Sequence, residues 1–245
     1  MKIALGQLAI NFEDKQNSFI SASGLTKTAA KNGHDIIFFP EMSLTGFSMN
    51  TAKTKESGRE TVKRFEALAK ENRIAVGFGW VEDADEKARN MYTVLDEKGN
   101  LIAEYAKIHP FSFAGEDKYF EGGNEVCRFE YKGIKFGAVI CYDLRFPYIF
   151  GGDYDVMAVP ANWPDSRREH WLTLLKARAI ENQAYVAGIN CAGSEYGNSA
   201  VFDANGELVN KAQYPQTILS FEADIEKTKE IRAGFPVRQD RKNIQ

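Results

Sequence analysis

Three residues that could take part in chemistry stand where apolar segments of the sequence end. Cys141 follows the run at residues 136–140, Glu41 follows "IIFFP", and Lys107 closes "LIAEYAK". A thiol needs a base to become a thiolate, and a carboxylate in a poorly hydrated pocket has a raised affinity for that proton. The negative oxygen of an acyl tetrahedral intermediate is stabilised by fixed donors such as an ammonium and a backbone N–H. Cysteine, glutamate and lysine therefore predict an acyl-transfer centre that needs no histidine.

Each of these three residues also has an ordinary structural interpretation. A cysteine at the end of an apolar strand most often fills space, Glu41 could cap a helix or pair with an arginine, and Lys107 could be a solvated strand end. Their shared position favours the chemical interpretation, because ligand sites of α/β proteins gather at the carboxyl ends of strands.

The segments that must position these residues alternate between strand and helix patterns. We predict helices over residues 14–31, 55–72 and 167–182. We predict strands or hairpins over residues 3–10, 35–40, 73–82, 90–96, 101–107, 126–131, 134–140, 154–160, 184–191 and 199–209. This mixture of alternation and hairpins favours two mixed sheets with helices outside. Without a low-complexity segment or a linker, residues 1–245 are predicted to form a single domain.

Residues 108–124 interrupt the pattern of strands and helices. They show no clean period and are crowded with glycine and aromatic residues. A connection of this length inside a compact domain is usually functional, so we expect it to contribute to the site.

The composition of the 245-residue chain argues against several classes of function. A formal net charge of -3 gives no basic footprint, so we expect no nucleic-acid partner. We expect no membrane association, because no segment has the apolar length of a membrane span and the N-terminal run is interrupted by Gln7. The three widely spaced cysteines, Cys127, Cys141 and Cys191, predict neither a disulfide framework nor a zinc site. We therefore expect no metal, no other cofactor and a reducing, cytoplasmic setting.

Taken as a set, five segments resemble the nitrilase superfamily of carbon–nitrogen hydrolases. They occur in the family's order and span nearly the whole chain: "FPEMSLTGF", "YAKIHPF", "VICYDLRFP", "PANWP" and "SAVFDANGE". The resemblance implies an α/β fold, a four-layer αββα sandwich with two mixed β-sheets, which usually pairs into a homodimer.

The same resemblance gives each residue of the predicted site a role. It implies that Glu41 is the general base, that Lys107 stabilises the oxyanion and that Cys141 is the nucleophile. Glu116, in the long connection, matches the family's second glutamate, which helps position the lysine and the substrate amide. The backbone N–H of Tyr142 is expected to complete the oxyanion hole.

Within the superfamily, residues 161–188 and the tail "FPVRQDR" most resemble ω-amidases, which hydrolyse the terminal amide of 2-oxoglutaramate or 2-oxosuccinamate. The remote carboxylate of such a substrate needs a cation, and an arginine provides one with two parallel hydrogen bonds. We predict Arg167 for this role, with Arg168 as its rival and a solvated helix N-terminus as the alternative explanation. Trp163 and Phe47 are expected to bind the rest of the substrate.

Other interpretations remain open. N-carbamoyl amidohydrolases, simple aliphatic amidases and nitrilases use the same core chemistry, and a non-catalytic binding module could share the fold. Such a module has no reason to hold a reactive Cys141 thiolate. A cysteine–histidine hydrolase would use His109, but it also needs an orienting acid. Arg145 is expected to form a structural ion pair beneath the turn at the cysteine.

Overall fold

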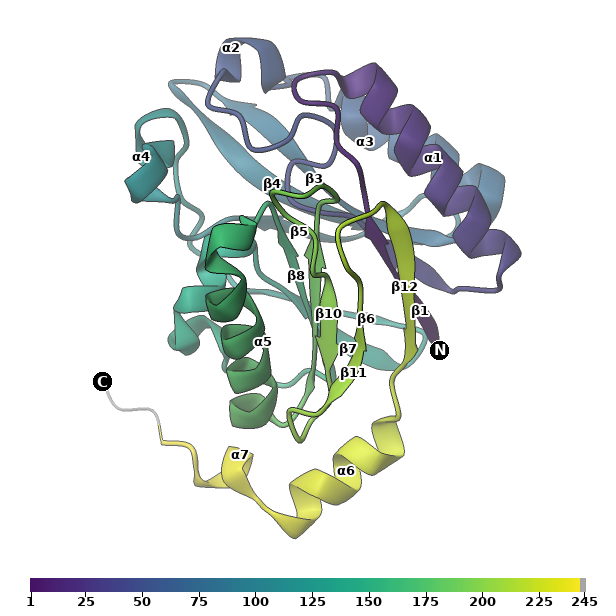
Figure 1. The fold of residues 1–245 in the computed structure, drawn as a ribbon, viewed down its shortest axis with the longest axis vertical. Coiled ribbons are helices and arrows are strands. Elements are labelled where there is room, and N and C mark those ends of the chain that lie inside the picture. The colour runs from purple at the N-terminus through teal and green to yellow at the C-terminus, as the bar shows by residue number, and fades with distance from the viewer. Residues whose placement is uncertain (243–245) are drawn as a thin grey trace.

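The computed structural model of the protein, which describes residues 1–242, contains two six-stranded β-sheets that pack face to face (Figure 1). In sheet order, the first sheet consists of β12 (Thr217–Glu222), β1 (Lys2–Gln7), β2 (Ile36–Phe38), β3 (Ala75–Ala84), β4 (Lys87–Leu95) and β5 (Leu101–Ala106). The second consists of β11 (Leu208–Lys211), β10 (Ala200–Phe202), β9 (Tyr185–Asn190), β8 (Val156–Ala161), β7 (Ile134–Ala138) and β6 (Cys127–Tyr131). Each sheet contains both parallel and antiparallel neighbours, as the sequence predicts.

Helices cover the outer face of each sheet (Figure 1). The longer ones are α1 (Lys15–Lys31) and α3 (Glu60–Asn72) on the first sheet and α5 (Arg168–Asn182) on the second. The others are α2 (Thr51–Thr54), α4 (Glu116–Tyr119), α6 (Ile225–Gly234) and α7 (Val237–Asp240), and 3₁₀ turns span Ser112–Ala114, Cys141–Arg145, Pro147–Phe150 and Asp165–Arg167. Within residues 1–242, none of these helices combines the length and the apolar composition that a membrane span requires. The predicted four-layer αββα sandwich is confirmed.

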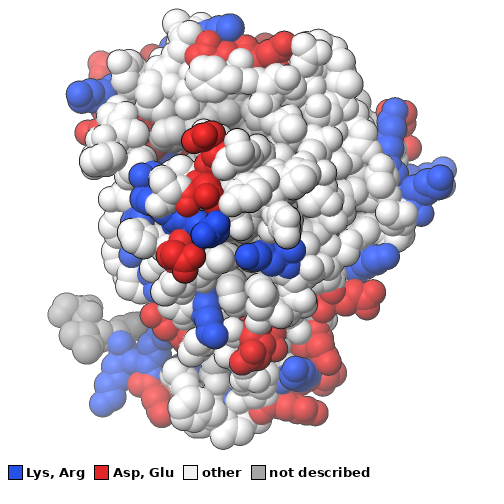
Figure 2. Space-filling view, in the orientation of Figure 1, with Lys and Arg blue, Asp and Glu red and all other residues white. Residues whose placement is uncertain are grey.

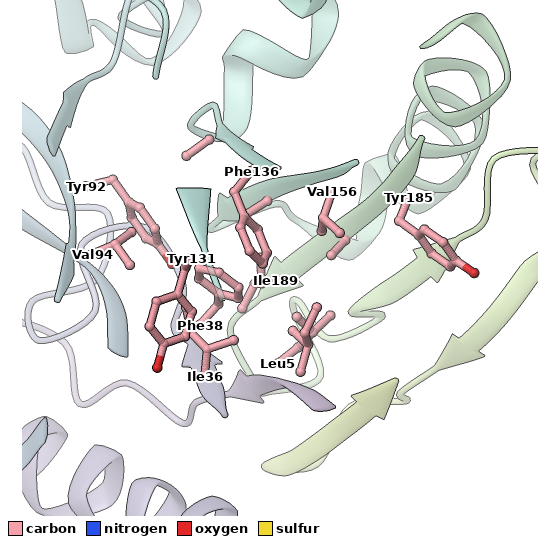
Figure 3. Close-up of a cluster of buried hydrophobic side chains, with 14 of the residues drawn as sticks. Leu5, Ile36, Phe38, Tyr92, Val94, Tyr131, Phe136, Val156, Tyr185 and Ile189 are labelled. Carbon is pink, nitrogen blue, oxygen red and sulfur yellow. The ribbon is translucent and has the colours of Figure 1, made fainter. Parts of the chain in front are cut away.

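Three apolar layers hold the sandwich together. The central layer lies between the two sheets and contains Phe38 from β2, Tyr92 from β4 and Phe136 from β7 (Figure 3). A second layer joins the first sheet to α1 and α3, where Phe65 stacks on Phe78 with ring centroids 4.1 Å apart. A third joins the second sheet to α5. Because both faces of each sheet are covered, the inner strands are apolar on both sides, which explains their continuous apolar runs.

One expectation about the elements is wrong, and one strand is missing from the prediction. The helix predicted over residues 55–72 is divided, because Glu56 leaves the helical path and forms an isolated bridge with Glu82. Its carboxylate then accepts the N–H and the hydroxyl of Thr61, at 2.8 and 2.6 Å, and so caps α3. The strand β12 is not predicted from the sequence at all, yet it pairs along its whole length with β1.

Candidate active site

The predicted site residues lie across the seam between the two sheets. Glu41 comes shortly after β2 and Lys107 directly after β5, both in the first sheet. Cys141 comes shortly after β7 in the second sheet, and Asn162 directly after the neighbouring β8. The structure therefore gathers at one place the strand ends that stand out in the sequence.

The chain turns sharply at Cys141. This residue has a φ of +47°, in the left-handed region that residues other than glycine rarely adopt, and it begins a 3₁₀ turn. Asp143 fastens the turn: its Oδ2 accepts the Ile140 N–H at 3.1 Å and the Tyr105 hydroxyl at 2.8 Å. Strained backbone of this kind persists only where the surroundings hold it, and here a buried carboxylate does so.

Glu41, Lys107 and Glu116 form a buried cluster of charges. The Nζ of Lys107 lies 2.8 Å from Oε1 of Glu41 and 2.8 Å from Oε2 of Glu116. No side chain of the three is more than 1% exposed. Burial alone would lower the pKa of the Lys107 ammonium, but the two carboxylates outweigh that effect and raise the pKa well above its ordinary value. The lysine is therefore a permanent, fixed cation.

The surroundings of Cys141 favour its neutral form, whereas those of Lys107 favour the charged form. Burial raises its pKa well above the ordinary value, the Glu41 carboxylate raises it further, and the Lys107 ammonium only partly opposes them. A raised pKa keeps the resting residue in its thiol form, which agrees with the prediction that it needs a base to become a thiolate. A thiol in this state needs a base beside it before it can attack a carbonyl carbon.

Two asparagines that are not among the predicted site residues complete the cluster. Asn90 donates from Nδ2 to Oε1 of Glu41 at 2.8 Å and to Oε1 of Glu116 at 3.0 Å. Asn162 donates its N–H to Oε2 of Glu41 at 3.0 Å and its side-chain amide to the Glu41 carbonyl at 2.7 Å. Asn162 falls within the quoted segment "PANWP", whereas the signal for Asn90 is weaker: a single amide in a strand of mostly apolar residues.

The backbone N–H of Tyr142 belongs to the first turn of the 3₁₀ segment, where amides have no partner within the helix. It is adjacent in sequence to Cys141, and the Tyr142 ring lines the same pocket, packed 4.7 Å from the centroid of Phe111. This amide and the Lys107 ammonium are thus two donors beside the thiol.

A cavity of about 280 Å³ opens onto Cys141. This volume is at the small end for ligand pockets and suits a substrate of few heavy atoms. Most of its wall is aromatic or apolar, and includes both predicted residues, Phe47 and Trp163. The other apolar and aromatic residues of the wall are Phe111, Phe113, Ala114, Tyr142, Pro164 and Tyr196.

Two arginines, Arg145 and Arg167, also line this pocket. Each guanidinium lies over an aromatic ring of the wall, 4.8 Å from the ring centroid for Arg145 and 5.6 Å for Arg167. Neither forms an ion pair within residues 1–242, so the ion pair expected for Arg145 is wrong. Arg168 lies outside the pocket wall and contacts Asp165 at 3.6 Å and Glu169 at 3.5 Å.

His109 has an orienting acid but does not lie in the pocket wall. Its Nδ1 is 2.6 Å from Oδ1 of Asp143, its Nε2 is 2.5 Å from the Tyr148 hydroxyl, and its ring stacks on Phe146. Both ring nitrogens are therefore occupied, and the imidazole is not placed to take a proton from Cys141.

The pocket wall thus contains a thiol, a fixed cation and amide groups, and two buried carboxylates lie directly behind the cation. These are the groups that acyl transfer requires. In the part of the chain that the structure describes, no group of three or more histidine, cysteine, aspartate or glutamate side chains is arranged to hold a metal ion.

Comparisons with known protein sequences agree with this geometry. The model of the carbon–nitrogen hydrolase family matches residues 2–233. The omega-amidase YafV of Yersinia enterocolitica is 36% identical over 215 residues, which cover 84% of each chain. The 2-oxoglutaramate amidase of Bacillus subtilis is 33% identical over 221 residues, again 84% of each chain.

Comparisons with solved structures lead to the same family. XC1258 from Xanthomonas campestris, a CN-hydrolase superfamily protein with an arsenic adduct in its active site, superposes with a TM-score of 0.94 at 27% identity, covering 100% of this chain and 98% of that one. Nit3 of Saccharomyces cerevisiae, of the nitrilase superfamily, gives a TM-score of 0.88 at 25% identity, covering 99% and 97%. The resemblance read from the sequence is confirmed, and the chain belongs to the carbon–nitrogen hydrolase family.

Proposed function

We propose that the protein is an ω-amidase, which hydrolyses the terminal amide of a small 2-oxo acid such as 2-oxoglutaramate or 2-oxosuccinamate and releases ammonia. The observation that carries the proposal is a small pocket with Cys141 in its wall and two arginines without ion-pair partners among residues 1–242. The relatives named omega-amidase and 2-oxoglutaramate amidase support the same substrate class.

In the proposed reaction, Glu41 takes the proton of the Cys141 thiol and the sulfur attacks the amide carbon. The oxyanion that develops accepts hydrogen bonds from the Lys107 ammonium and the Tyr142 backbone N–H. The intermediate collapses to a thioester, and ammonia leaves with the proton that Glu41 returns. Glu41 then removes a proton from water, which attacks the thioester. The carbon–sulfur bond breaks, the dicarboxylic 2-oxo acid leaves, and Glu41 returns the proton to the Cys141 sulfur.

Glu116 has a positioning role in this proposal. Its Oε2 accepts hydrogen bonds from the Lys107 ammonium at 2.8 Å and from the Phe111 N–H at 2.5 Å. Since Phe111 lines the pocket, this carboxylate links the cation to the segment that contacts the substrate. Charge-assisted bonds of this kind hold a group in one place.

Recognition of the substrate carboxylate falls to the arginines of the pocket wall. Burying a carboxylate without a partner is very costly, and a guanidinium removes that cost with two parallel hydrogen bonds. Arg167 is the predicted partner, and its position in the wall supports that role; Arg145 is a second candidate that the geometry adds. Phe47 and Trp163 are proposed to pack against the carbon chain of the substrate.

Ammonia release tests the proposed substrate class directly. We would compare kcat/KM for 2-oxosuccinamate, an uncharged short-chain amide, a nitrile and an N-carbamoyl amino acid. The ω-amide is expected to be the best of the four. A preference for one of the other compounds would replace the ω-amidase assignment by aliphatic amidase, nitrilase or N-carbamoyl amidohydrolase, and no turnover of any compound would favour a binding module.

We further propose that the physiological partner is a small-molecule amide and that the reaction needs no cofactor, nucleic acid or membrane. Figure 2 shows a face of the protein on which basic and acidic side chains are interspersed. The formal net charge of -3 likewise gives no basic excess of the kind that nucleic-acid binding requires.

The organisation of the protein is also part of the proposal: residues 1–245 act as one carbon–nitrogen hydrolase domain, in the cytoplasm and as a homodimer. The first sheet supports a single domain, because it joins β1 and β12 from distant parts of the sequence. Cys127 and Cys191 are buried and unpaired, which fits a reducing compartment. The homodimer follows from the family resemblance, and light scattering on the purified protein measures it.

A further inference from the structure

Asn90 connects all three charged residues of the site. It lies on β4 and is 1% exposed. Its Nδ2 donates to Glu41 and to Glu116, at 2.8 and 3.0 Å, and its backbone carbonyl accepts the Lys107 N–H at 2.9 Å. Two donors therefore bridge the same pair of carboxylates: the neutral amide of Asn90 and the charged ammonium of Lys107.

The two ends of the Asn90 amide are in different situations. Nδ2 makes both hydrogen bonds, whereas Oδ1 is buried and has no hydrogen-bond partner among residues 1–242. Turning the amide over would bring Oδ1 against two carboxylate oxygens, Oε1 of Glu41 and Oε1 of Glu116, which is repulsive. The orientation of the amide is thus set by its two hydrogen bonds to the glutamates, which leave its Oδ1 without a partner among residues 1–242.

The two oxygens of Glu41 are consequently unlike each other. Oε1 accepts from Asn90 and from the Lys107 ammonium, each at 2.8 Å. Oε2 accepts the Asn162 N–H at 3.0 Å and has only a long contact of 3.5 Å to the side-chain amide of the same residue. The Asn162 N–H also borders the Cys141 sulfur, where it partly offsets the effect of burial on the pKa of the thiol. Oε2 is therefore the less occupied oxygen, and it shares the Asn162 N–H with the Cys141 sulfur.

We propose that Asn90 is a positioning residue of the amidase reaction, which occupies Oε1 of Glu41 so that Oε2 receives the proton of Cys141. By donating to both glutamates, it also fixes the position of Glu41 relative to Glu116. Asn90 does not line the pocket and acts through Glu41 and Glu116. The inference rests on the proposed function, because it assigns Asn90 a task in that reaction.

The substitution Asn90→Asp separates this task from a space-filling one, because it keeps the shape and changes the hydrogen-bonding capacity. An ionised aspartate donates nothing and repels both glutamates, whereas a protonated one donates a single hydrogen bond. We expect kcat of N90D to be about 10²-fold below wild type near pH 8, with little change in KM, and to recover relative to wild type toward about pH 5.5. Asn90→Ala, which has no proton to gain, should lose a similar factor at every pH.

Alkylation of Cys141 by iodoacetamide, followed by mass spectrometry, provides a readout that does not depend on the substrate. Relative to wild type, the alkylation rate of N90D is expected to be low at high pH and to recover toward low pH, as its kcat does. Asn90→Ser keeps one neutral donor and should lie between wild type and Asn90→Ala at every pH, which tests the inference even if N90D does not fold. Asn182→Asp is the matched control: it places a carboxylate at another buried amide, outside the pocket wall, and should keep the wild-type profile.

A wild-type pH profile in N90D, or full kcat in Asn90→Ala, overturns the role of Asn90 even if ω-amides are hydrolysed. Conversely, ω-amides could fail to be turned over while the alkylation rate of N90D still recovers relative to wild type toward low pH. That result would support the role of Asn90, and only the proposed substrate would fail.

Discussion

The carboxylate of Asp143 accepts two hydrogen bonds from His109, one from its backbone N–H at 2.9 Å and one from its imidazole at 2.6 Å. Asp143 stands two residues after Cys141, and His109 two residues after Lys107. The pair therefore fastens the segment that contains Cys141 to the segment that contains Lys107, across the seam between the sheets.

Asp143→Asn should weaken this connection without changing its shape. An amide can accept only at one end, so at least one of the donors at Ile140, His109 and Tyr105 loses its partner. Leaving a buried donor without its acceptor typically costs about 1–3 kcal/mol. We expect a lower free energy of unfolding in urea and a lower kcat, with wild-type KM in the fraction that remains folded. Wild-type stability and kcat in this variant would show that the turn at Cys141 does not depend on the Asp143 carboxylate.

The nucleophile is tested by substituting each cysteine in turn. Cys141→Ala should abolish ammonia release, since no other cysteine lies in the pocket wall. Cys127→Ala and Cys191→Ala should keep nearly all of it, because both side chains are buried and unpaired, and burial raises the pKa of both thiols, that of Cys127 to about 11. Equal losses in all three variants would mean that the cysteines matter for folding rather than for chemistry.

The general base is tested by comparing Glu41→Gln with His109→Gln. Glutamine keeps the size of Glu41 but cannot accept the thiol proton, so kcat/KM and the alkylation rate of Cys141 should both fall by roughly 10²-fold or more. His109→Gln should cost less than about tenfold, because both nitrogens of the ring are bonded away from the thiol. The reverse order of losses would restore the cysteine–histidine mechanism.

The carboxylate partner is tested by Arg167→Met and Arg145→Met, with Arg168→Met as a control outside the pocket. Loss of one charge-assisted pair should raise KM for 2-oxosuccinamate by roughly 10- to 100-fold. The slow hydrolysis of an uncharged short-chain amide should hardly change, which distinguishes lost recognition from a damaged pocket. The larger KM effect identifies the partner, and equal effects on both substrates would contradict a role for either arginine in binding a carboxylate.

Folding stability should depend on pH through His34. Its Nδ1 lies 3.0 Å from the Ala29 carbonyl and its Nε2 2.7 Å from the Ser220 hydroxyl, an arrangement that fits the neutral ring. Burial lowers the pKa of His34, so the unfolded chain binds this proton more readily than the folded protein. Stability should fall as the pH drops through about 6.5, the ordinary histidine value, and this part of the loss should end below the lower pKa of the folded state. The fall in the free energy of unfolding between about pH 7.5 and 5.5 should be smaller in His34→Gln than in wild type and unchanged in His170→Gln, an exposed histidine.

The sequence predicts those parts of the fold and the site that depend on local pattern. Apolar runs locate most strands within a few residues, and the polar residues that follow them, Glu41, Lys107 and Cys141, meet in the structure. What it does not predict depends on contacts between distant segments. Asn90 gains its partners from the register of β4 beside β5 and from the packing of residues 108–124, neither of which a single segment encodes.

Arg145 and β12 illustrate the same limit. An arginine near a strand end is commonly part of an ion pair, and only the tertiary structure puts Arg145 over Trp163 in the pocket wall. β12 is a short strand of mixed composition whose partner, β1, is at the other end of the sequence. The prediction of one helix over residues 55–72 is wrong for a third reason. The buried hydrogen bonds of the Glu56 carboxylate override a continuous helical pattern in the sequence.

The pairing of β1 with β12 also sets when the enzyme can become active during its synthesis. Lys2 pairs with Glu222 and Gln7 with Thr217, so the first sheet lacks a strand until residue 222 has left the ribosome. Glu41 and Lys107 emerge early, but Cys141 and Asn162 belong to a second sheet that is translated later. We therefore expect the growing chain to have no activity until the last strands of both sheets have been synthesised. Contacts between such distant residues also make folding slow for a protein of this size, which exposes the early sheet to chaperones before it is closed.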